Sequence, residues 1–204
     1  MPSIEARINL PPIFDMDLDD PFIITVELIL HHHSSNTFRT KEIPLFNGKV
    51  MNKGGLTFIN TATGIETPRN TIVFCEPGPE GPLRVAVEDS FTSLRPGEKY
   101  IIEGSMYRTY ISFDFGPNGS PEEIKAVIKN RPKAWDWWHA ENLEEGSTYR
   151  IGIDQNKAIK RWLEGNKKEL LSKLLTKRTD DKMKSGPIFF HVIQPAEFIV
   201  KKPE

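Results

Sequence analysis

Alternation of hydrophobic and polar residues predicts that most of this chain forms β-strands. Residues 3–10 alternate strictly, and residues 22–31 repeat the pattern over a longer stretch. Such alternation is typical of a strand with one buried and one exposed face. Shorter runs that favour strands are residues 42–46, 56–59, 71–75, 83–87, 100–106, 107–115, 188–193 and 198–200.

Turns that contain glycine or proline separate these runs, as at Asn47-Gly48 and Pro96-Gly97. No segment of helical character connects the strands of the first half, so we expect them to pair in antiparallel fashion. The fold class predicted is mainly β, a single antiparallel immunoglobulin-like β-sandwich domain over residues 1–204. Its sheet strands come from residues 1–118, 147–153 and 187–200.

Helix signals occur in two places that we interpret as additions to the sheets. Residues 120–146 are predicted to form a short helix and a tryptophan-rich loop, because Ser120-Pro121-Glu122-Glu123 combines an N-cap, a first-turn proline and a capping glutamate. Residues 154–176 are predicted to form a basic helical insertion. Its first helix carries Ile159, Trp162 and Leu163 on one side, and Gly165 separates it from a second, leucine-rich helix.

One short pattern occurs twice, as Leu94-Arg-Pro-Gly-Glu-Lys-Tyr100 and as Leu143-Glu-Glu-Gly-Ser-Thr-Tyr149. A tyrosine that opens a strand after a glycine turn can bury its ring and return its hydroxyl to the preceding backbone, as in a tyrosine corner. In this the chain resembles immunoglobulin-like and fibronectin type III sandwiches, although the Cys and Trp pair of antibody domains is missing. Residues 162–171 are similar to uncharacterised β-sandwich proteins of filamentous fungi, and that resemblance implies no catalytic residues.

Composition narrows the class of protein. The chain has 204 residues, is 38% hydrophobic, and balances 27 Lys and Arg against 28 Asp and Glu, which argues against disorder and against a general nucleic-acid coat. Its single cysteine, Cys75, cannot form an intramolecular disulfide and is interpreted as a buried structural thiol. Charges at Glu5 and Arg7 disfavour a signal peptide, and Phe22–Leu30 is too short to span a membrane. We expect a soluble, cytoplasmic protein.

The richest chemistry lies in residues 131–141, which hold three of the four tryptophans. Aromatic rings on a loop above a sheet can form a ligand pocket or a protein interface, although they can also simply close a sandwich. The predicted binding residues here are Trp135, Trp137, Trp138 and His139. A second polar and aromatic cluster, for which a solvated strand face is the simpler account, consists of Tyr107, Arg108 and Tyr110.

Metal and nucleotide motifs are sparse. His31 and His33 would share one face of a strand and are the candidates for a metal pair, but no third ligand is visible, so no metal or other cofactor is expected. The acidic residues from Asp15 to Asp20 do not form an EF-hand, because Asp20 takes the place of the required glycine. Serine-nucleophile and phosphate-loop motifs are absent from the sequence.

The function predicted from the sequence is an interaction module that binds a protein or an apolar small molecule through the tryptophan-rich loop. The alternative is a cofactor-independent isomerase, cyclase or hydrolase that acts on an apolar small molecule. In that enzyme His139 would exchange protons with Asp136 or Glu141 near neutral pH. A homodimer formed through an exposed sheet edge is a third possibility. The basic surplus of residues 157–184 could meet an acidic partner, an anionic membrane surface or RNA, but no motif predicts sequence-specific nucleic-acid binding.

Overall fold

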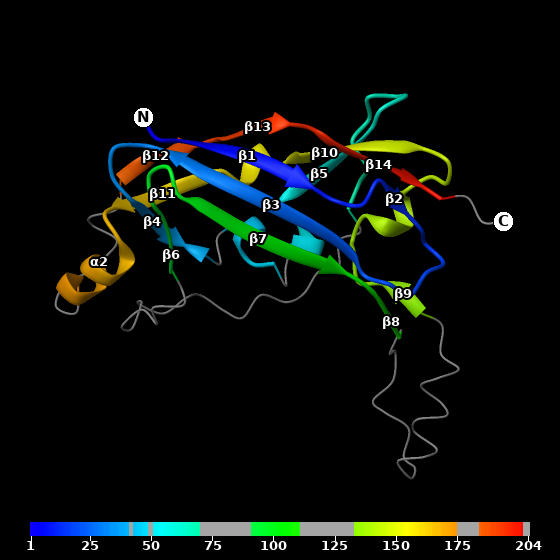
Figure 1. Cartoon of the computed structure of the whole chain (residues 1–204), viewed down its shortest axis with the longest axis horizontal. Helices are drawn as coiled ribbons and strands as arrows, with labels where there is room; N and C mark the ends of the chain where they lie inside the picture. The colour runs from blue at the N-terminus through cyan, green and yellow to red at the C-terminus, as the bar shows by residue number, and fades with distance from the viewer. Residues whose placement is uncertain (41–42, 49–50, 70–90, 111–132, 175–183, 202–204) are drawn as a thin grey trace, which may run out of the picture.

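The computed structural model describes residues 1–40, 43–48, 51–69, 91–110, 133–174 and 184–201, and it confirms a mainly β chain (Figure 1). Residues 71–75 and 83–87, Cys75, residues 111–115, the helix predicted after Ser120 and residues 175–183 lie outside the described residues. The described strands form four sheets. Among the described residues, no helix combines the length and the apolar composition needed to cross a membrane.

Two four-stranded sheets contain parallel as well as antiparallel pairs. The first has the order β13 (Phe190–Gln194), β1 (Ser3–Asn9), β3 (Phe22–His31), β7 (Lys99–Met106). The second has the order β2 (Ile13–Phe14), β14 (Ala196–Val200), β10 (Thr148–Ile153), β5 (Leu56–Asn60). The prediction of purely antiparallel pairing is wrong, because β1 pairs with β13 and β2 with β14 in parallel. These partners come from opposite ends of the chain, so no local helical crossover is needed to join them.

The third sheet is antiparallel and lies beside the one described helix (Figure 1). Its order is β12 (Lys184–Ile188), β11 (Ile159–Glu164), β4 (Asn36–Arg39), β6 (Phe91–Leu94). The fourth sheet contains β8 (Arg108–Tyr110) and β9 (Lys133–Trp135). The helix α2 (Lys167–Leu174) lies at the end of the molecule away from β8 and β9 (Figure 1).

The alternating residues of β3 explain why this strand anchors the core. Ile24, Val26 and Leu28 are fully buried, whereas the intervening side chains face outward. Burying each such side chain stabilises the fold by about 1.5–3 kcal/mol. Inward-facing residues from all three four-stranded sheets belong to one continuous hydrophobic cluster. The alternation of the sequence therefore reports correctly on the buried face of this strand.

The prediction of a first helix within residues 154–176 is wrong, because residues 159–164 form the strand β11. The pairing of β11 with β12 shifts register between Ile159 and Arg161, which brings Ile159 and Trp162 to the same buried face. Leu163 follows Trp162, points to the opposite face of the strand and is buried as well. A bulge breaks strand alternation, and the resulting spacing imitates that of a helix. Only the second of the two expected helices is described, as α2, and Gly165 precedes it with a φ of 121°.

Further differences concern short elements. Residues 42–46 were expected to form a strand, but Pro44–Phe46 is a 3₁₀ turn with the proline at its start. No individual strand was expected at the positions of β2, β4, β6 and β9, or over most of β12. The tyrosine corner is confirmed at Tyr149, whose ring is buried and whose hydroxyl accepts a hydrogen bond from the Glu144 N–H at 2.8 Å. Gly146 supports this turn with a φ of 75°.

Candidate functional site

The structure brings together the two aromatic clusters that the sequence places far apart. Strand β8 pairs with β9 so that Arg108 lies opposite Trp135 and Tyr110 opposite Lys133. This ladder continues from β7 at one end of the molecule (Figure 1). The segment of tryptophans is therefore held by strand pairing and is not a free loop.

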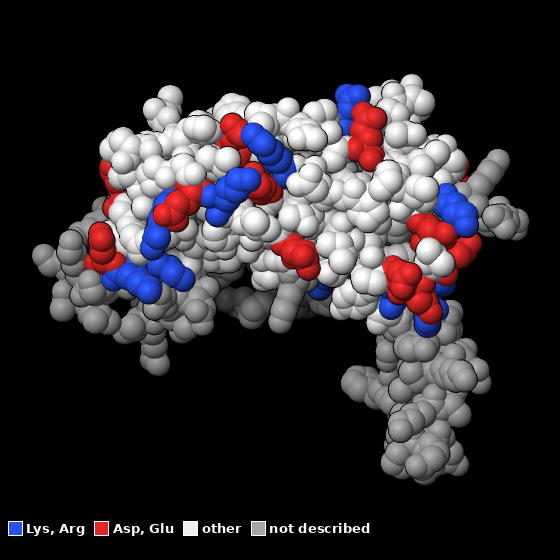
Figure 2. Space-filling model, viewed as in Figure 1, with Lys and Arg blue, Asp and Glu red and all other residues white. Residues whose placement is uncertain are grey.

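The acidic loop of residues 15–20 contacts one side of the β8–β9 ladder. Asp19 contacts Lys133 at 2.5 Å and Arg108 at 3.8 Å. The hydrogen bond from Lys133 is the main reason that the pKa of Asp19 lies below its usual value. The Trp135 indole N–H donates to the Met16 carbonyl at 3.1 Å. Acidic and basic side chains lie next to one another at this end of the face shown in Figure 2.

Trp137 is part of the hydrophobic core. Only 2% of the residue is exposed. Its ring centroid lies 5.0 Å from those of Phe14 and Phe58, and it stacks on Phe22 at 5.7 Å. Trp135 and Trp138 are half-buried. Of the three predicted binding tryptophans, only these two have surface within reach of a ligand.

His139 is also interior, with 1% exposure and its ring 4.5 Å from that of Phe58. Among the described residues, neither ring nitrogen has a hydrogen-bond partner. Burial, assisted by the charge of Arg69, lowers the pKa of His139 to about 4. The structure joins neither Asp136 nor Glu141 to this imidazole by a hydrogen bond. A neutral, enclosed ring of this kind cannot exchange protons with a substrate in the described conformation.

An open groove lies beside the tryptophan segment, with a volume of about 840 Å³. Its walls combine hydroxyl, amide and carboxylate groups with two aromatic rings. The lining residues are Thr40, Phe46, Asn47, Gly48, Asn52, Glu103, Ser105 and Tyr107. Among the described lining residues, Tyr107 is the one that was also predicted as a binding residue from the sequence.

Two glycines allow the segment that precedes β5 to lie close against β7. A side chain at Gly48 would collide with the Glu103 carbonyl. A Cβ at Gly104 would lie 2.5 Å from the Met51 side chain. Met51 therefore fills the space that Gly104 leaves, while Glu103 and Ser105 point outward from β7. The alternation of β7 places Glu103 and Ser105 in the groove and Ile102 and Met106 in the core.

Backbone hydrogen bonds fix the tryptophan segment to this groove. The Asp136 N–H donates to the Tyr107 carbonyl at 2.8 Å, and the Trp138 N–H donates to the Asn52 carbonyl at 3.1 Å. The side-chain amide of Asn52 donates to the Asp136 carbonyl at 2.6 Å. The other amide atom of Asn52, Oδ1, is buried and has no hydrogen-bond partner in the part of the chain that the structure describes. Asn52 thus connects the tryptophan segment to the groove and keeps one acceptor unused.

The sequence did not single out most residues of this groove, because they come from three separate segments. Asn47-Gly48 was interpreted only as a turn, and residues 100–106 only as a strand. Gly104, inside an alternating run, was the available sign that another segment packs closely there. Of the predicted metal pair, His31 contacts Glu5 at 3.3 Å, whereas His33 contacts Glu164, so the two do not share a site.

Comparison with protein-family models, with curated proteins and with solved structures gives no match for this chain.

Proposed function

We propose that this protein is a binding module whose ligand occupies the groove that β7 and Tyr107 form with Thr40, residues 46–48 and Asn52. The observation that supports this proposal is the junction of the β8–β9 aromatic ladder with an open groove of about 840 Å³. That volume falls within the range of small-molecule sites, about 300–1,000 Å³. The tryptophan segment then serves as the rigid support of the groove, and Trp137 anchors it in the core.

The lining of the groove defines the chemistry of the ligand. Glu103 supplies a carboxylate, and no lysine or arginine is among the described lining residues. Tyr107, which is 47% exposed, offers a ring and a hydroxyl, and Ser105 offers a second, exposed hydroxyl. These groups favour a ligand with hydrogen-bond donors or a positive charge and an aromatic or aliphatic part. This is more polar than the apolar molecule expected from the sequence.

Binding is better supported than acid–base catalysis. The enzyme hypothesis depends on His139, which is enclosed and has no carboxylate partner among the described residues. The groove offers Glu103, but no described lining residue is a histidine, lysine or cysteine that could act with it as a proton carrier or nucleophile. Recognition without chemistry is the function that these residues favour.

The test is a screen of small aromatic amines and neutral aromatic amides against ¹⁵N-labelled protein by NMR. Ligands should shift the amide signals of Asn52, Ser105 and Tyr107 together, and amines should bind more tightly than matched neutral amides. Tyr107→Ala and Glu103→Gln should each raise the dissociation constant of an amine by about tenfold, which corresponds to about 1.4 kcal/mol.

Glu98→Gln is the matched control for Glu103→Gln. Glu98 lies just before β7, is exposed, and is absent from the described lining of the groove. Its substitution removes the same charge and should leave binding unchanged. Equal effects of Glu98→Gln and Glu103→Gln, or shifts scattered over the surface, would contradict a ligand in this groove.

A further inference from the structure

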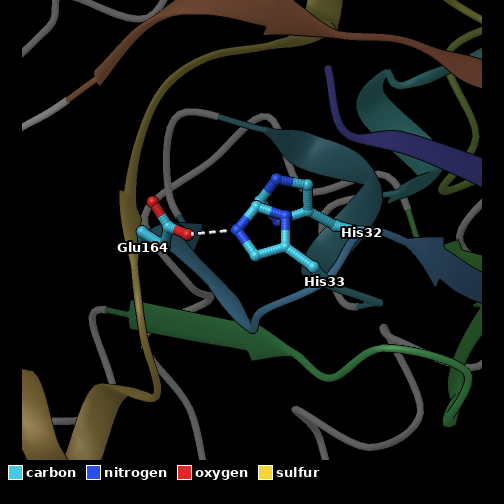
Figure 3. Close-up of side chains that lie close together, drawn as sticks. All are labelled: His32, His33 and Glu164. Atoms are coloured by element: carbon cyan, nitrogen blue, oxygen red, sulfur yellow. Dashed lines mark hydrogen bonds and ion pairs between the residues drawn. The ribbon is translucent and has the colours of Figure 1, made fainter.

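A second cluster of side chains lies away from the groove, where the chain leaves β3. His32 and His33 follow the last residue of β3, and Glu164 ends β11. One ligand atom from each of the three residues lies within 4.8 Å of the others. Figure 3 shows the two imidazoles side by side, with the Glu164 carboxylate facing His33.

A bend in the backbone explains why neighbouring histidines can converge. In a continuing strand, His32 and His33 would point to opposite faces. The strand ends at His31, and the next three residues form a bend. The two rings therefore lie with their centroids 4.0 Å apart. His31 stays on the strand and contacts Glu5 instead.

The two oxygens of Glu164 have separate partners. Oε1 accepts a hydrogen bond from the Ser34 hydroxyl at 2.6 Å and lies 2.8 Å from His33 Nε2. Oε2 forms an ion pair with the Lys184 ammonium group. The hydrogen bonds from Lys184 and Ser34 lower the pKa of Glu164 to about 2. The group is thus a carboxylate at neutral pH, with Oε1 directed at the histidines.

The neighbours of His32 determine its tautomer. Nδ1 lies 3.1 Å from the Ser34 carbonyl oxygen, which can only accept a hydrogen bond. In the neutral ring Nδ1 therefore carries the proton, and Nε2 keeps a free lone pair. The edge-to-face contact with Trp162, at 5.7 Å between centroids, orients the ring. A histidine whose second nitrogen donates to a carbonyl is the usual arrangement around a metal.

We propose that His32, His33 and Glu164 bind one divalent transition-metal ion of the Zn²⁺ class. Two imidazole nitrogens and one carboxylate oxygen are a ligand set that such ions prefer, and three protein ligands leave a fourth position for water or an external ligand. Ligand atoms around Zn²⁺ lie about 3.5 Å apart, and the three ligand atoms here lie within 4.8 Å of one another, so small side-chain rotations are enough to bring them to one ion.

The ion takes the place of the hydrogen bond between His33 and Glu164. If His33 Nε2 carries a proton in the metal-free protein, that proton leaves to solvent or moves to Nδ1 as the metal binds. Lys184 can keep its ion pair with Glu164 Oε2 and so orient the carboxylate. The Ser34 carbonyl can keep its hydrogen bond with His32 Nδ1 and so orient the imidazole. The bound ion would connect the bend after β3 to β11 and so raise the melting temperature.

The experiment uses the untagged, chelator-treated full chain and titrates Zn²⁺ by calorimetry and Co²⁺ by visible absorption. One ion per chain is expected. His32→Ala, His33→Ala and Glu164→Gln should each weaken Zn²⁺ binding by about tenfold or more. His31→Ala is the matched control, because this neighbouring histidine lies outside the cluster, and its affinity should be unchanged.

A measurement on the unmodified protein covers the case in which Glu164→Gln disturbs folding. Zn²⁺ should shift the imidazole NMR signals of His32 and His33 but not those of His31 or His191. If His31→Ala weakens Zn²⁺ binding as much as His33→Ala does, and if a folded Glu164→Gln variant binds Zn²⁺ as the wild type does, the site holds an adventitious ion only. That result, or the absence of stoichiometric Zn²⁺ binding, would overturn the proposal.

Discussion

Acidification should destabilise this protein through one buried side chain, His139. The unfolded chain has a histidine pKa near 6.5, whereas burial holds the pKa of His139 at about 4 in the folded protein. The unfolded state therefore binds more protons between these two values, so the free energy of unfolding falls as the pH falls. The stabilisation is fully present above pH 6.5 and is lost progressively down to about pH 4.

The magnitude follows from the difference in pKa. A gap from 6.5 to about 4, at about 1.36 kcal/mol per pKa unit, corresponds to about 3 kcal/mol of unfolding free energy. This value is a large part of the stability of an ordinary domain, about 5–15 kcal/mol. The size of the effect depends on the enclosure of the ring and on the absence of hydrogen-bond partners for both nitrogens.

The assay is urea denaturation of the wild type and of His139→Leu at pH 7, 6, 5 and 4, followed by far-ultraviolet circular dichroism. Leucine fills a similar volume and cannot titrate, so the wild type should lose about 3 kcal/mol relative to the variant over this range. Glu164 contributes in both proteins, and only as the pH falls from 4.5 towards 2, so its contribution cancels. Parallel pH profiles for the two proteins would refute the assignment of a buried neutral imidazole.

Two further substitutions test the packing around the site. Trp137→Ala should lower the free energy of unfolding by about 3–5 kcal/mol because it empties a core position. Trp138→Ala, at a half-buried position, should lower it clearly less. Urea denaturation midpoints measure both, and equal losses would contradict the burial of Trp137. Tyr149→Phe removes the hydroxyl that accepts from the Glu144 N–H and should cost about 1 kcal/mol by the same assay. Tyr100→Phe, in the related turn, is the comparison, and a cost at Tyr149 no greater than at Tyr100 would argue against the tyrosine corner.

Local patterns in the sequence were sufficient to predict the strands that bury one face. β1 and β3 alternate without interruption, so their period identifies both the element and its inner side. β11 could not be identified in this way, because a register shift near Ile159 produces helical spacing. The parallel pairs depend on contacts between the two ends of the chain, which a local period does not report.

The candidate site was predictable only in part. The concentration of aromatic residues identified the tryptophan segment and Tyr107, but it could not distinguish Trp137, which packs in the core, from Trp138 at the surface. Asn52 and Glu103 line the same groove only because β7 packs closely against Gly48 and Met51, which the glycines at positions 48 and 104 allow. His31 and His33 were expected to share a face because strand alternation was extended past His31, where the backbone bends and separates the two side chains.

The most direct test of the proposed site is amide hydrogen exchange at Asp136 and Trp138. Their N–H groups donate to Tyr107 and Asn52, two lining residues of the groove, and hold the tryptophan segment in place as its support. We predict protection of both amides similar to that of the central residues of β7, with further slowing when a groove ligand binds. Exchange at the rate of an unprotected loop would show that the segment is not a fixed wall and would contradict the account.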